Sequence, residues 1–566
     1  MAELIEDISF CLNSENNQVL PKEYLDPTSL AQKTARILKN MSLSSAKNSL
    51  YTFVEMFTFK FLSDLGVLKN IYSFNNIYDL CKDTDSKTAF MQYLTTVRKR
   101  LQDLFPANPV DGTSIINGRL FHTEVDNAGV PIIIGTAADC FEKLLDCFKE
   151  YDGEYGEFIY INKDFKSKLF ETFMKNSSDK DGMGQFFTPL KVVQEMVRMV
   201  DIRKNMSICD PARGVAKFLL EAAKEITDPF YFENGVLKSN IELVGFEKRM
   251  EDNNDDLTTF LAKANALIYY SDLFKNNCDS DEKIQMLANG LLNKLVISHH
   301  TTLGTLGILI PNKYDLILAN PPYYQSAIIS KQCKNVKIKT TDANGNVIEN
   351  NAYTENGKGV ESAFLEWIIK SLKPNGTANI VLPDGIFTNI GNKKIKKYIL
   401  DNCDIESIIS LPIGTFFNTP KKTYIFTITK RDSSQIGRKQ THKIFTYLCS
   451  TIGETLDAYR FDTEENDLHK AVTKYNIYKS SKDDEDVQKL ILSDPRLKLL
   501  DIDIFYIIDT KNDVNWNIDN LWTEEEKIAL GIKEKTNVVS IDEFQNMLND
   551  AIIDIKAFKE ELECMK

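Results

Sequence analysis

The residues best suited to chemistry are Asn320, Pro321, Pro322 and Tyr323, which directly follow the run 315–319, Asp-Leu-Ile-Leu-Ala. This run predicts a buried strand, and the two consecutive prolines then fix φ and remove two backbone donors. The strand would end by presenting the Asn320 side-chain oxygen and the Pro321 carbonyl as rigid acceptors. Two acceptors suit an exocyclic amine, because accepting both of its N–H groups makes the nitrogen more nucleophilic. The alternative is an ordinary Asn-Pro turn that ends a strand.

The ring of Tyr323 adds a second feature to this motif, because an aromatic face stacks on a flat base with about 1–3 kcal/mol. No general base is evident in the sequence. Acceptors alone would then activate the amine, and its proton would leave later.

A tight turn upstream has the composition of a cofactor site. The segment 207–220 predicts a strand, a turn and a helix, with Asp210, Ala212 and Gly214 in the turn. Such a turn lets a cofactor approach the backbone and the N-terminus of the following helix.

Two acidic residues follow the turn at intervals that suit the same ligand. Glu247 ends the predicted strand 241–247, and an acid at the tip of a second strand suits the two hydroxyls of a ribose. Asp272 follows the apolar stretch 265–270, where we expect another strand to end, and its carboxylate would accept from an adenine amine. Each acid alone is typical of a solvated loop, but their order supports a single site.

A third candidate group precedes the turn and consists of Gly184, Gln185, Phe186, Phe187 and Thr188. Thr188 suits the N-cap of a predicted helix and Pro189 suits its first turn. Capping explains the Thr-Pro pair. Capping does not explain the glycine-rich residues before the helix or the two adjacent phenylalanines. These residues therefore favour a contact with a ligand.

The elements that must position these residues alternate between strands and helices. Six β-rich runs are expected as strands, at 206–211, 241–246, 314–322, 377–383, 406–412 and 423–429. Amphipathic helical stretches lie between several of them, which predicts a parallel, doubly wound α/β sheet with helices on both faces. Ligands of such sheets bind at the carboxyl ends of the strands, where the candidate residues stand.

Three regions are predicted: a helical N-terminal domain over 1–155, a catalytic domain over 156–432, and a C-terminal region over 433–566. The last region ends in an amphipathic helix with a capping box at Ser540 and Glu543. Its apolar stripe packs on its own domain or docks a partner helix. The stripe consists of Phe544, Leu548, Ile552, Ile555 and Phe558.

The polar segment 324–360 interrupts the alternation, and we expect either a structureless insertion or a lid that orders over DNA. With two other basic clusters it forms a candidate cationic rim. The rim residues are Lys331, Lys334, Lys393, Lys394, Lys421 and Lys422. The net charge of −13 nevertheless argues against a protein that binds nucleic acid by itself. A partner would then have to supply much of the attraction.

The bulk composition is that of a globular protein, with 43% apolar and 26% charged residues. The 10 cysteines form no CxxC pair, so we expect reduced thiols and no metal site. No signal peptide or membrane span is evident, so we expect a cytoplasmic protein.

The ordered motifs resemble the modification subunit of type I restriction–modification systems, a gamma-class N6-adenine DNA methyltransferase. The resemblance rests on 184–189, 210–220, Glu247, 320–323 and 361–388, and it covers roughly residues 150–430. It implies a Rossmann-like sheet that binds S-adenosylmethionine and methylates the N6 amine of adenine in double-stranded DNA. It also implies a sequence-specificity subunit, two modification subunits in each complex, and a restriction subunit as a further partner.

The resemblance implies a role for each matching residue. The methionine part of the cofactor would contact Phe187 and Thr188, with Gly184, Gln185 and Phe186 beside them. Asp210, Ala212, Gly214 and Asn320 would line the pocket, Glu247 would hold the ribose and Asp272 the adenine. A base flipped out of the duplex would meet the acceptors of 320–323 and stack on Tyr323, Phe416 or Phe417.

The turn departs from the family pattern at two positions. Arg213 replaces a small cysteine and Ala216 replaces a glycine, and an alanine held at positive φ costs on the order of 1 kcal/mol or more. Arg213 would either crowd the pocket or point outward. A catalytically weakened scaffold subunit is therefore one alternative, and a methyltransferase for RNA or protein glutamine is another.

Overall fold

The computed structural model divides the chain into two compact units, Met1–Asp519 and Asn520–Lys566. The structure describes residues 28–39, 46–116, 124–133, 135–155, 188–248, 257–299, 301, 303–324, 326–341, 346–355, 357–416, 421–457, 460–506, 516–533, 545, 548 and 555–556. Since the described residues up to Asp519 form one unit, the domain boundaries expected after residues 155 and 432 stay predictions.

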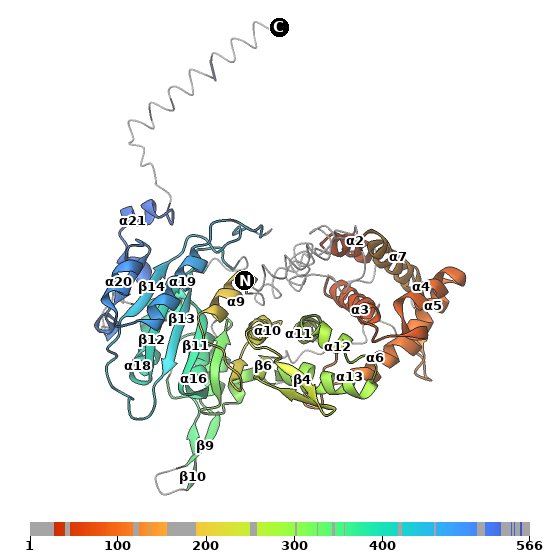
Figure 1. Ribbon diagram of the computed structural model, residues 1–566, viewed down its shortest axis with the longest axis horizontal. Helices are drawn as coiled ribbons and strands as arrows, with labels where there is room; N and C mark the ends of the chain where they lie inside the picture. Colours follow the sequence, from red (N-terminus) through yellow and green to blue (C-terminus); the bar gives the residue numbers. More distant parts are fainter. Residues whose placement is uncertain are drawn as a thin grey trace. The chain divides into compact units, whose positions relative to one another are not determined.

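A mixed sheet of nine strands forms the centre of the first unit within the described residues, in the order β15-β14-β12-β13-β11-β8-β3-β6-β7 (Figure 1). The strands are β3 (Ser207–Asp210), β6 (Glu242–Lys248), β7 (Val296–His299), β8 (Tyr314–Ala319), β11 (Leu372–Pro383), β12 (Cys403–Ser410), β13 (Thr423–Lys430), β14 (Ile444–Leu448) and β15 (Leu497–Leu500). The five strands from β11 to β7 are parallel, whereas β13 is antiparallel to both of its neighbours. The predicted α/β sheet is confirmed, and the antiparallel β13 is the main departure from a purely parallel one.

Helices cover both faces of the sheet, which explains why its central strands are continuous apolar runs instead of alternating ones. On one face, Leu316 and Leu318 of β8 join the same apolar cluster as residues of the flanking helices α9 and α10. On the other face, α16 packs on β11 and α18 packs on β12. The bounds are α9 (Leu190–Arg198), α10 (Lys217–Lys224), α16 (Val360–Ser371), α17 (Asp384–Thr388), α18 (Lys393–Asn402), α19 (Asp467–Ser480) and α20 (Glu485–Ile491).

The N-terminal part of the first unit is helical, as predicted. Its helices are α2 (Thr28–Lys39), α3 (Ala46–Asp64), α4 (Phe74–Asp83), α5 (Ser86–Gln92), α6 (Arg98–Leu104) and α7 (Ala137–Tyr155). Aromatic pairs fill its core, for example Phe59 with Tyr93 at 5.0 Å between ring centroids. A short hairpin of β1 (Glu124–Val125) and β2 (Pro131–Ile132) precedes α7.

Polar contacts, buried at Lys263 and exposed at Arg100, join this helical part to the helices beside the sheet. The Lys263 ammonium, on α11 (Leu257–Tyr269), donates to the Thr113 carbonyl at 2.9 Å and to Asn293 Oδ1 at 2.8 Å. Arg100 forms a bidentate pair with Asp281, with both N–O distances at 2.6 Å. The neighbouring elements are α12 (Ser271–Lys275), α13 (Asp281–Leu287), α14 (Asn293–Leu295) and the hairpin β4 (Phe230–Glu233) and β5 (Val236–Ser239).

The segment 324–360 is not structureless where the structure describes it. It contains the helix α15 (Ala327–Cys333) and an antiparallel hairpin of β9 (Lys337–Thr341) and β10 (Val347–Asn351). The hairpin ends beside α16, where the Lys370 ammonium donates to the Ala352 carbonyl at 2.7 Å.

The second unit contains α21 (Glu524–Ala529), which begins with a capping box between Thr523 and Glu526. The predicted C-terminal amphipathic helix falls almost wholly outside the described residues, apart from Gln545, Leu548, Ile555 and Lys556. Across the described chain, no helix combines the length and the apolar character that a membrane crossing would need.

Candidate active site

β8 carries Asn320 to the carboxyl edge of the sheet, between the ends of β11 and β3. The strand residues Leu316 to Ala319 are fully buried, whereas Asn320 itself is partly exposed. The Asn320 amide donates through Nδ2 to Thr188 Oγ1 at 3.0 Å, and the Tyr323 hydroxyl donates to Asn320 Oδ1. These two contacts orient the amide so that its nitrogen faces Thr188 and its oxygen faces the hydroxyl of Tyr323.

Asn320 shares a crevice with the turn after β3 and with the tip of β6. The lining residues are Thr188, Asp210, Ala212, Arg213, Gly214, Val215, Lys217, Phe218, Glu247, Asn320 and Pro322, around a cavity of about 60 Å³. Six of the residues expected to bind a cofactor are therefore brought together at the carboxyl ends of neighbouring parallel strands. An open α/β sheet binds its ligands at this edge.

The turn after β3 is held by its own first residue. Asp210 Oδ1 accepts the Ala212 N–H at 3.0 Å, and the Ala216 N–H donates to the Arg213 carbonyl at 2.7 Å. Gly214 has φ +50° and Ala216 has φ +66°. Ala216 thus occupies the left-handed conformation for which the sequence departure was expected to carry a cost.

Two carboxyl groups face this crevice, that of the fully buried Asp210 and that of the half-buried Glu247. Glu247 Oε2 accepts the Gly214 N–H at 2.9 Å, and burial raises the pKa of this carboxyl while the charge of Arg213 acts in the opposite direction. Burial also raises the pKa of the Asp210 carboxyl well above its usual range. Carboxyl groups that lose hydration in this way gain most from a ligand that supplies hydroxyl or amine donors.

Arg213 neither points outward nor lies loose in the crevice. Its guanidinium donates to the Gly214 carbonyl at 2.7 Å and to Thr259 Oγ1 at 2.8 Å. The aliphatic part of the side chain lies over Gly245 on β6, where a Cβ atom would come within 2.7 Å of Arg213 Cδ. The glycine thus provides the space that the larger residue needs.

Sequence reasoning missed Lys217, the first residue of α10. It is buried, lines the crevice and donates from its ammonium to the Thr188 carbonyl at 3.4 Å. The signal that would have found it is its place in the turn motif, directly after Ala216. Its cation adds a group that suits an anionic part of a ligand.

Two expected site residues, Asp272 and Phe416, do not join the crevice, and five others cannot be placed within the described part of the chain. Gly184, Gln185, Phe186, Phe187 and Phe417 lie outside the described residues. Asp272 is exposed in the first turn of α12, and the strand expected before it is wrong, because 257–269 forms the helix α11. Phe416 is only 9% exposed and belongs to the apolar core cluster. Its ring is packed in the protein and would have to move to stack on a base.

The six candidate DNA-binding lysines have different surroundings. Lys331, Lys334, Lys393 and Lys394 are exposed. Lys421 is also exposed, and its ammonium donates to the Tyr323 carbonyl at 3.0 Å, which joins it to residues 320–323, the acceptor loop. Lys422 has a side chain only 16% exposed that pairs with Asp519 at 3.4 Å, so its charge is already matched within the protein.

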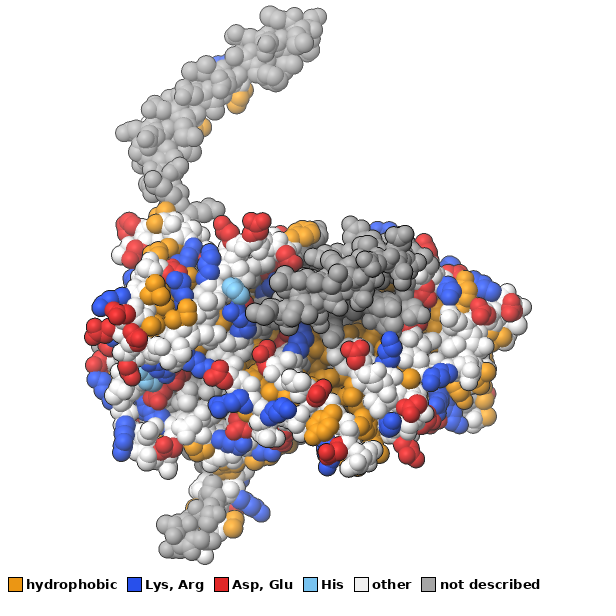
Figure 2. Space-filling view, viewed as in Figure 1, with side chains coloured by type: hydrophobic (Ala, Val, Ile, Leu, Met, Phe, Trp, Pro, Cys, Tyr) orange, Lys and Arg blue, Asp and Glu red, His pale blue; other side chains and the backbone are white. Residues whose placement is uncertain are grey.

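The surface in view is mixed in charge. Figure 2 shows Lys and Arg side chains interspersed with Asp and Glu over the visible described surface, in keeping with the net charge of −13. Such a surface attracts DNA weakly, because phosphate binding depends on concentrated positive charge.

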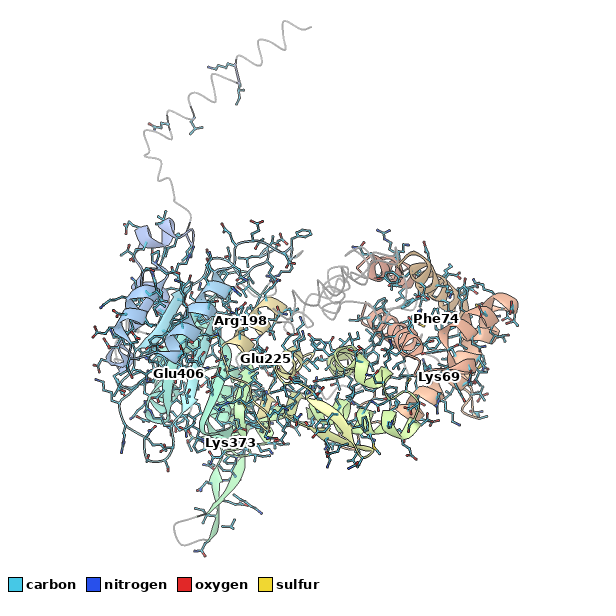
Figure 3. All side chains as sticks on the ribbon, viewed as in Figure 1. Lys69, Phe74, Arg198, Glu225, Lys373 and Glu406 are labelled. Atoms are coloured by element: carbon cyan, nitrogen blue, oxygen red, sulfur yellow. The ribbon has the colours of Figure 1, made fainter. Side chains whose placement is uncertain are left out.

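The hairpin β9–β10 belongs to the opposite end of the sheet, so the expected lid over DNA is not supported. Its base contacts Lys370, whose carbonyl accepts the Asn312 N–H just before β8 begins. Lys373, which pairs with Asp315 at 2.8 Å, lies at this end next to the hairpin in Figure 3. The six residues of β8 separate this end from Asn320 by about 20 Å at the usual rise along a strand.

Comparison with known proteins agrees with this geometry. A family model described as N-6 DNA Methylase matches residues 161–494. The methylase subunit of the type I restriction enzyme StySJI from Salmonella typhimurium is 24% identical over 301 residues, which cover 50% of this chain and 47% of that protein. The EcoEI methylase subunit from Escherichia coli is 28% identical over 266 residues, or 46% of either chain. The chain thus spans about half the length of these curated relatives.

A solved structure shows the same fold over most of the chain. The type I restriction-modification system methyltransferase subunit from Streptococcus thermophilus superposes with a TM-score of 0.55 at 17% sequence identity. The match covers 87% of this chain and 98% of that chain. The arrangement of sheet and helices described above is therefore shared with a methyltransferase subunit.

Proposed function

Since the chain belongs to the N-6 DNA methylase family, whose model matches residues 161–494, we propose that it methylates the N6 amine of adenine in double-stranded DNA with S-adenosylmethionine. The observation that carries the proposal is that Asn320, in its Asn-Pro-Pro-Tyr motif, lines the same crevice as Asp210 and Glu247. The acceptors for the amine and the acids for a nucleoside-like cofactor therefore stand side by side. Methylation of RNA or protein glutamine is not favoured, because the matching family is one of DNA methylases.

The residues present fit the cofactor chemically. Glu247 would accept from ribose hydroxyls, and Asp210 and the backbone of Gly214 would face the same ligand. The buried ammonium of Lys217 suits the carboxylate at the amino-acid end. Bound there, S-adenosylmethionine supplies an electrophilic methyl group on a sulfonium.

The acceptor loop would act on the other reactant. Asn320 Oδ1 and the Pro321 carbonyl would accept the two amine hydrogens and direct the nitrogen lone pair at the methyl group. The nitrogen would take the methyl group from the sulfonium, which would leave as a neutral thioether, and the surplus amine proton would pass to solvent. The Tyr323 hydroxyl now donates to Asn320 Oδ1, so the amine would either displace this hydroxyl or use the second lone pair of the oxygen.

The charge of the chain supports a multisubunit assembly. With a net charge of −13, the chain would gain DNA affinity from a partner that contacts the phosphates. We propose that it acts as the modification subunit of a restriction–modification complex, with a specificity subunit that reads the sequence and two modification subunits per complex. A restriction subunit would complete that system.

The test is transfer of tritiated methyl groups from S-adenosylmethionine to unmethylated DNA, with the full chain alone and together with the product of the neighbouring gene. Asn320→Ala should lower transfer by about a hundredfold or more, since loss of one directed hydrogen-bonding group costs this much in comparable sites. The cofactor dissociation constant, measured by calorimetry, should change less than twofold. Asn335→Ala, an exposed asparagine after α15, is the matched control. Unchanged transfer by the Asn320 variant would refute the assignment.

A further inference from the structure

A second cavity lies on the other side of the acceptor loop, at the carboxyl ends of β8 and β11. Its volume is about 140 Å³, and its walls include Tyr324, Glu361, Asp384 and Lys421. Tyr324 directly follows the Asn-Pro-Pro-Tyr motif, and Asp384 directly follows β11. The cavity therefore adjoins the acceptor loop without being part of the crevice beside Asp210 and Glu247.

Glu361, the second residue of α16, places a buried carboxyl group in the wall of this cavity. The residue is 8% exposed, and its Oε2 atom has no hydrogen-bond partner among the described residues. The side chain folds back over Gly359, where a Cβ atom would lie 2.2 Å from Glu361 Oε1. Because an unsatisfied buried oxygen is costly, this carboxyl is expected to gain a partner when the cavity is filled.

Glu361 is also coupled to the acceptor loop. The Val360 N–H donates to the Tyr324 carbonyl at 3.0 Å, so the first turn of α16 is joined to the residue after the motif. In its ionised form, Glu361 adds to the rise in the pKa of the Tyr323 phenol, which burial mainly causes, so the two groups lie close to each other. Since that phenol donates to Asn320 Oδ1, Glu361 stands one side chain away from the amine acceptor.

We propose that the cavity receives the ring of the extruded adenine and that Glu361 hydrogen-bonds a ring nitrogen next to the amine, which makes it a specificity-determining residue. The inference rests on the proposed function and extends it to the recognition of the base. Asn320 and Pro321 would accept the hydrogens of the amine, and Glu361 would bind the ring nitrogen beside it.

The chemistry of the bases fits a carboxyl group in this place. Adenine has unprotonated ring nitrogens on both sides of its amine, N1 and N7, and each needs a donor. A protonated carboxyl group is such a donor, and burial raises the pKa of Glu361, although Lys421 acts in the opposite direction. Thymine and guanine carry a carbonyl where adenine has its amine, so they would face the oxygens of Asn320 and Pro321 without a donor.

The test compares substrates in which one ring nitrogen is removed. The full chain, together with the partner that supports its methylation, is given duplexes whose target adenine is replaced by 1-deazaadenine or 7-deazaadenine. The target position comes from mapping N6-methyladenine in DNA that the protein has modified. We expect the wild type to lose about tenfold in kcat/KM on one of the two analogues, because one hydrogen bond is missing.

Variants then assign that loss to a residue. Glu361→Ala should methylate adenine and the discriminating analogue with equal kcat/KM, whereas Glu361→Gln should keep the discrimination, because its amide still donates. The ratio of the two rates does not depend on the fraction of folded protein. Glu366→Gln is the matched control, since Glu366 lies on the same helix but accepts from the Thr354 and Glu355 backbones. It should leave the ratio unchanged.

Three results would overturn the proposal. The first is equal methylation of adenine and both analogues by the wild type, and the second is undiminished discrimination by Glu361→Ala. In both cases adenine is still methylated, so the proposed function stands. The third is the absence of adenine methylation by the wild type with its partner, which overturns the proposed function as well.

Discussion

Replacing Thr188 with valine isolates the hydroxyl that orients the catalytic amide. Valine has nearly the shape of threonine but lacks the oxygen, so Asn320 Nδ2 loses the acceptor that now lies at 3.0 Å. The amide can then rotate by half a turn, which would place its NH₂ group where the target amine needs an oxygen. Thr188 is therefore expected to act on the methyl-transfer step through Asn320.

The magnitude follows from the surroundings of the amide. A neutral hydrogen bond contributes about 0.5–1.5 kcal/mol, and an unsatisfied buried donor costs about 1–3 kcal/mol. Because Asn320 is partly exposed, water will replace some of the lost bond, and we expect a cost of about 1–2 kcal/mol. This corresponds to a decrease of about 5- to 30-fold in the rate constant of methyl transfer.

Single-turnover methylation and cofactor calorimetry together distinguish this role from a direct contact with the cofactor. If Thr188 orients the amide, the valine variant transfers methyl groups more slowly but binds S-adenosylmethionine nearly as well as the wild type. Thr188→Ser keeps the oxygen and should retain most of the rate. A valine variant with a normal rate and weakened cofactor binding would refute the orienting role.

Two further perturbations concern the cofactor crevice. Glu247→Ala should weaken S-adenosylmethionine binding by about tenfold to a hundredfold, as expected for charge-assisted hydrogen bonds to the ribose worth about 1.5–3 kcal/mol; an unaltered dissociation constant in calorimetry would exclude this role. Ala216→Gly relieves about 1–2 kcal/mol of left-handed strain but loses a buried methyl worth about 0.8 kcal/mol and adds about 0.4–1 kcal/mol of unfolded-state entropy. The free energy of unfolding should thus change by less than about 1 kcal/mol in denaturant titrations, and cofactor binding should tighten; destabilisation above 2 kcal/mol would contradict the strain.

The sequence alone predicted the position of a site residue wherever a short apolar run ended in a residue that is unusual in a strand. The prolines after Asn320 and the acid at Glu247 stand directly at strand ends in the structure, as predicted. The reason is clearest for β8, which is buried on two faces, so its apolar run is continuous and its end is abrupt. The edge of the sheet that holds the crevice then follows from the parallel order of the strands.

Two regions show where a local pattern was not enough. The apolar stretch before Asp272 was expected to be a strand, but most of it is the end of α11, where the preceding run Leu261-Ala-Lys-Ala264 favours a helix. The hairpin β9–β10 was not predicted, although Asn344-Gly345 lies between its strands and is a common hairpin signal. The polar composition of the segment concealed that signal, and its position at the far end of the sheet depends on contacts with α16 that no local pattern encodes.

Arg213, which departs from the family pattern, is accommodated by two residues of β6. A large cationic residue in the cofactor turn needs both space and a counter-charge, and each is supplied by β6. Gly245 leaves room for the aliphatic chain, and Glu247, two residues further along the same strand, stabilises the charge. Since Glu247 already accepts the Gly214 N–H, a ribose hydroxyl must donate to the remaining lone pairs of the carboxylate, whose ionised form the charge of Arg213 favours against the effect of burial. Arg213 thus supports the charge state in which Glu247 binds a hydroxyl best, which explains how the crevice tolerates a residue that at first looks incompatible with it.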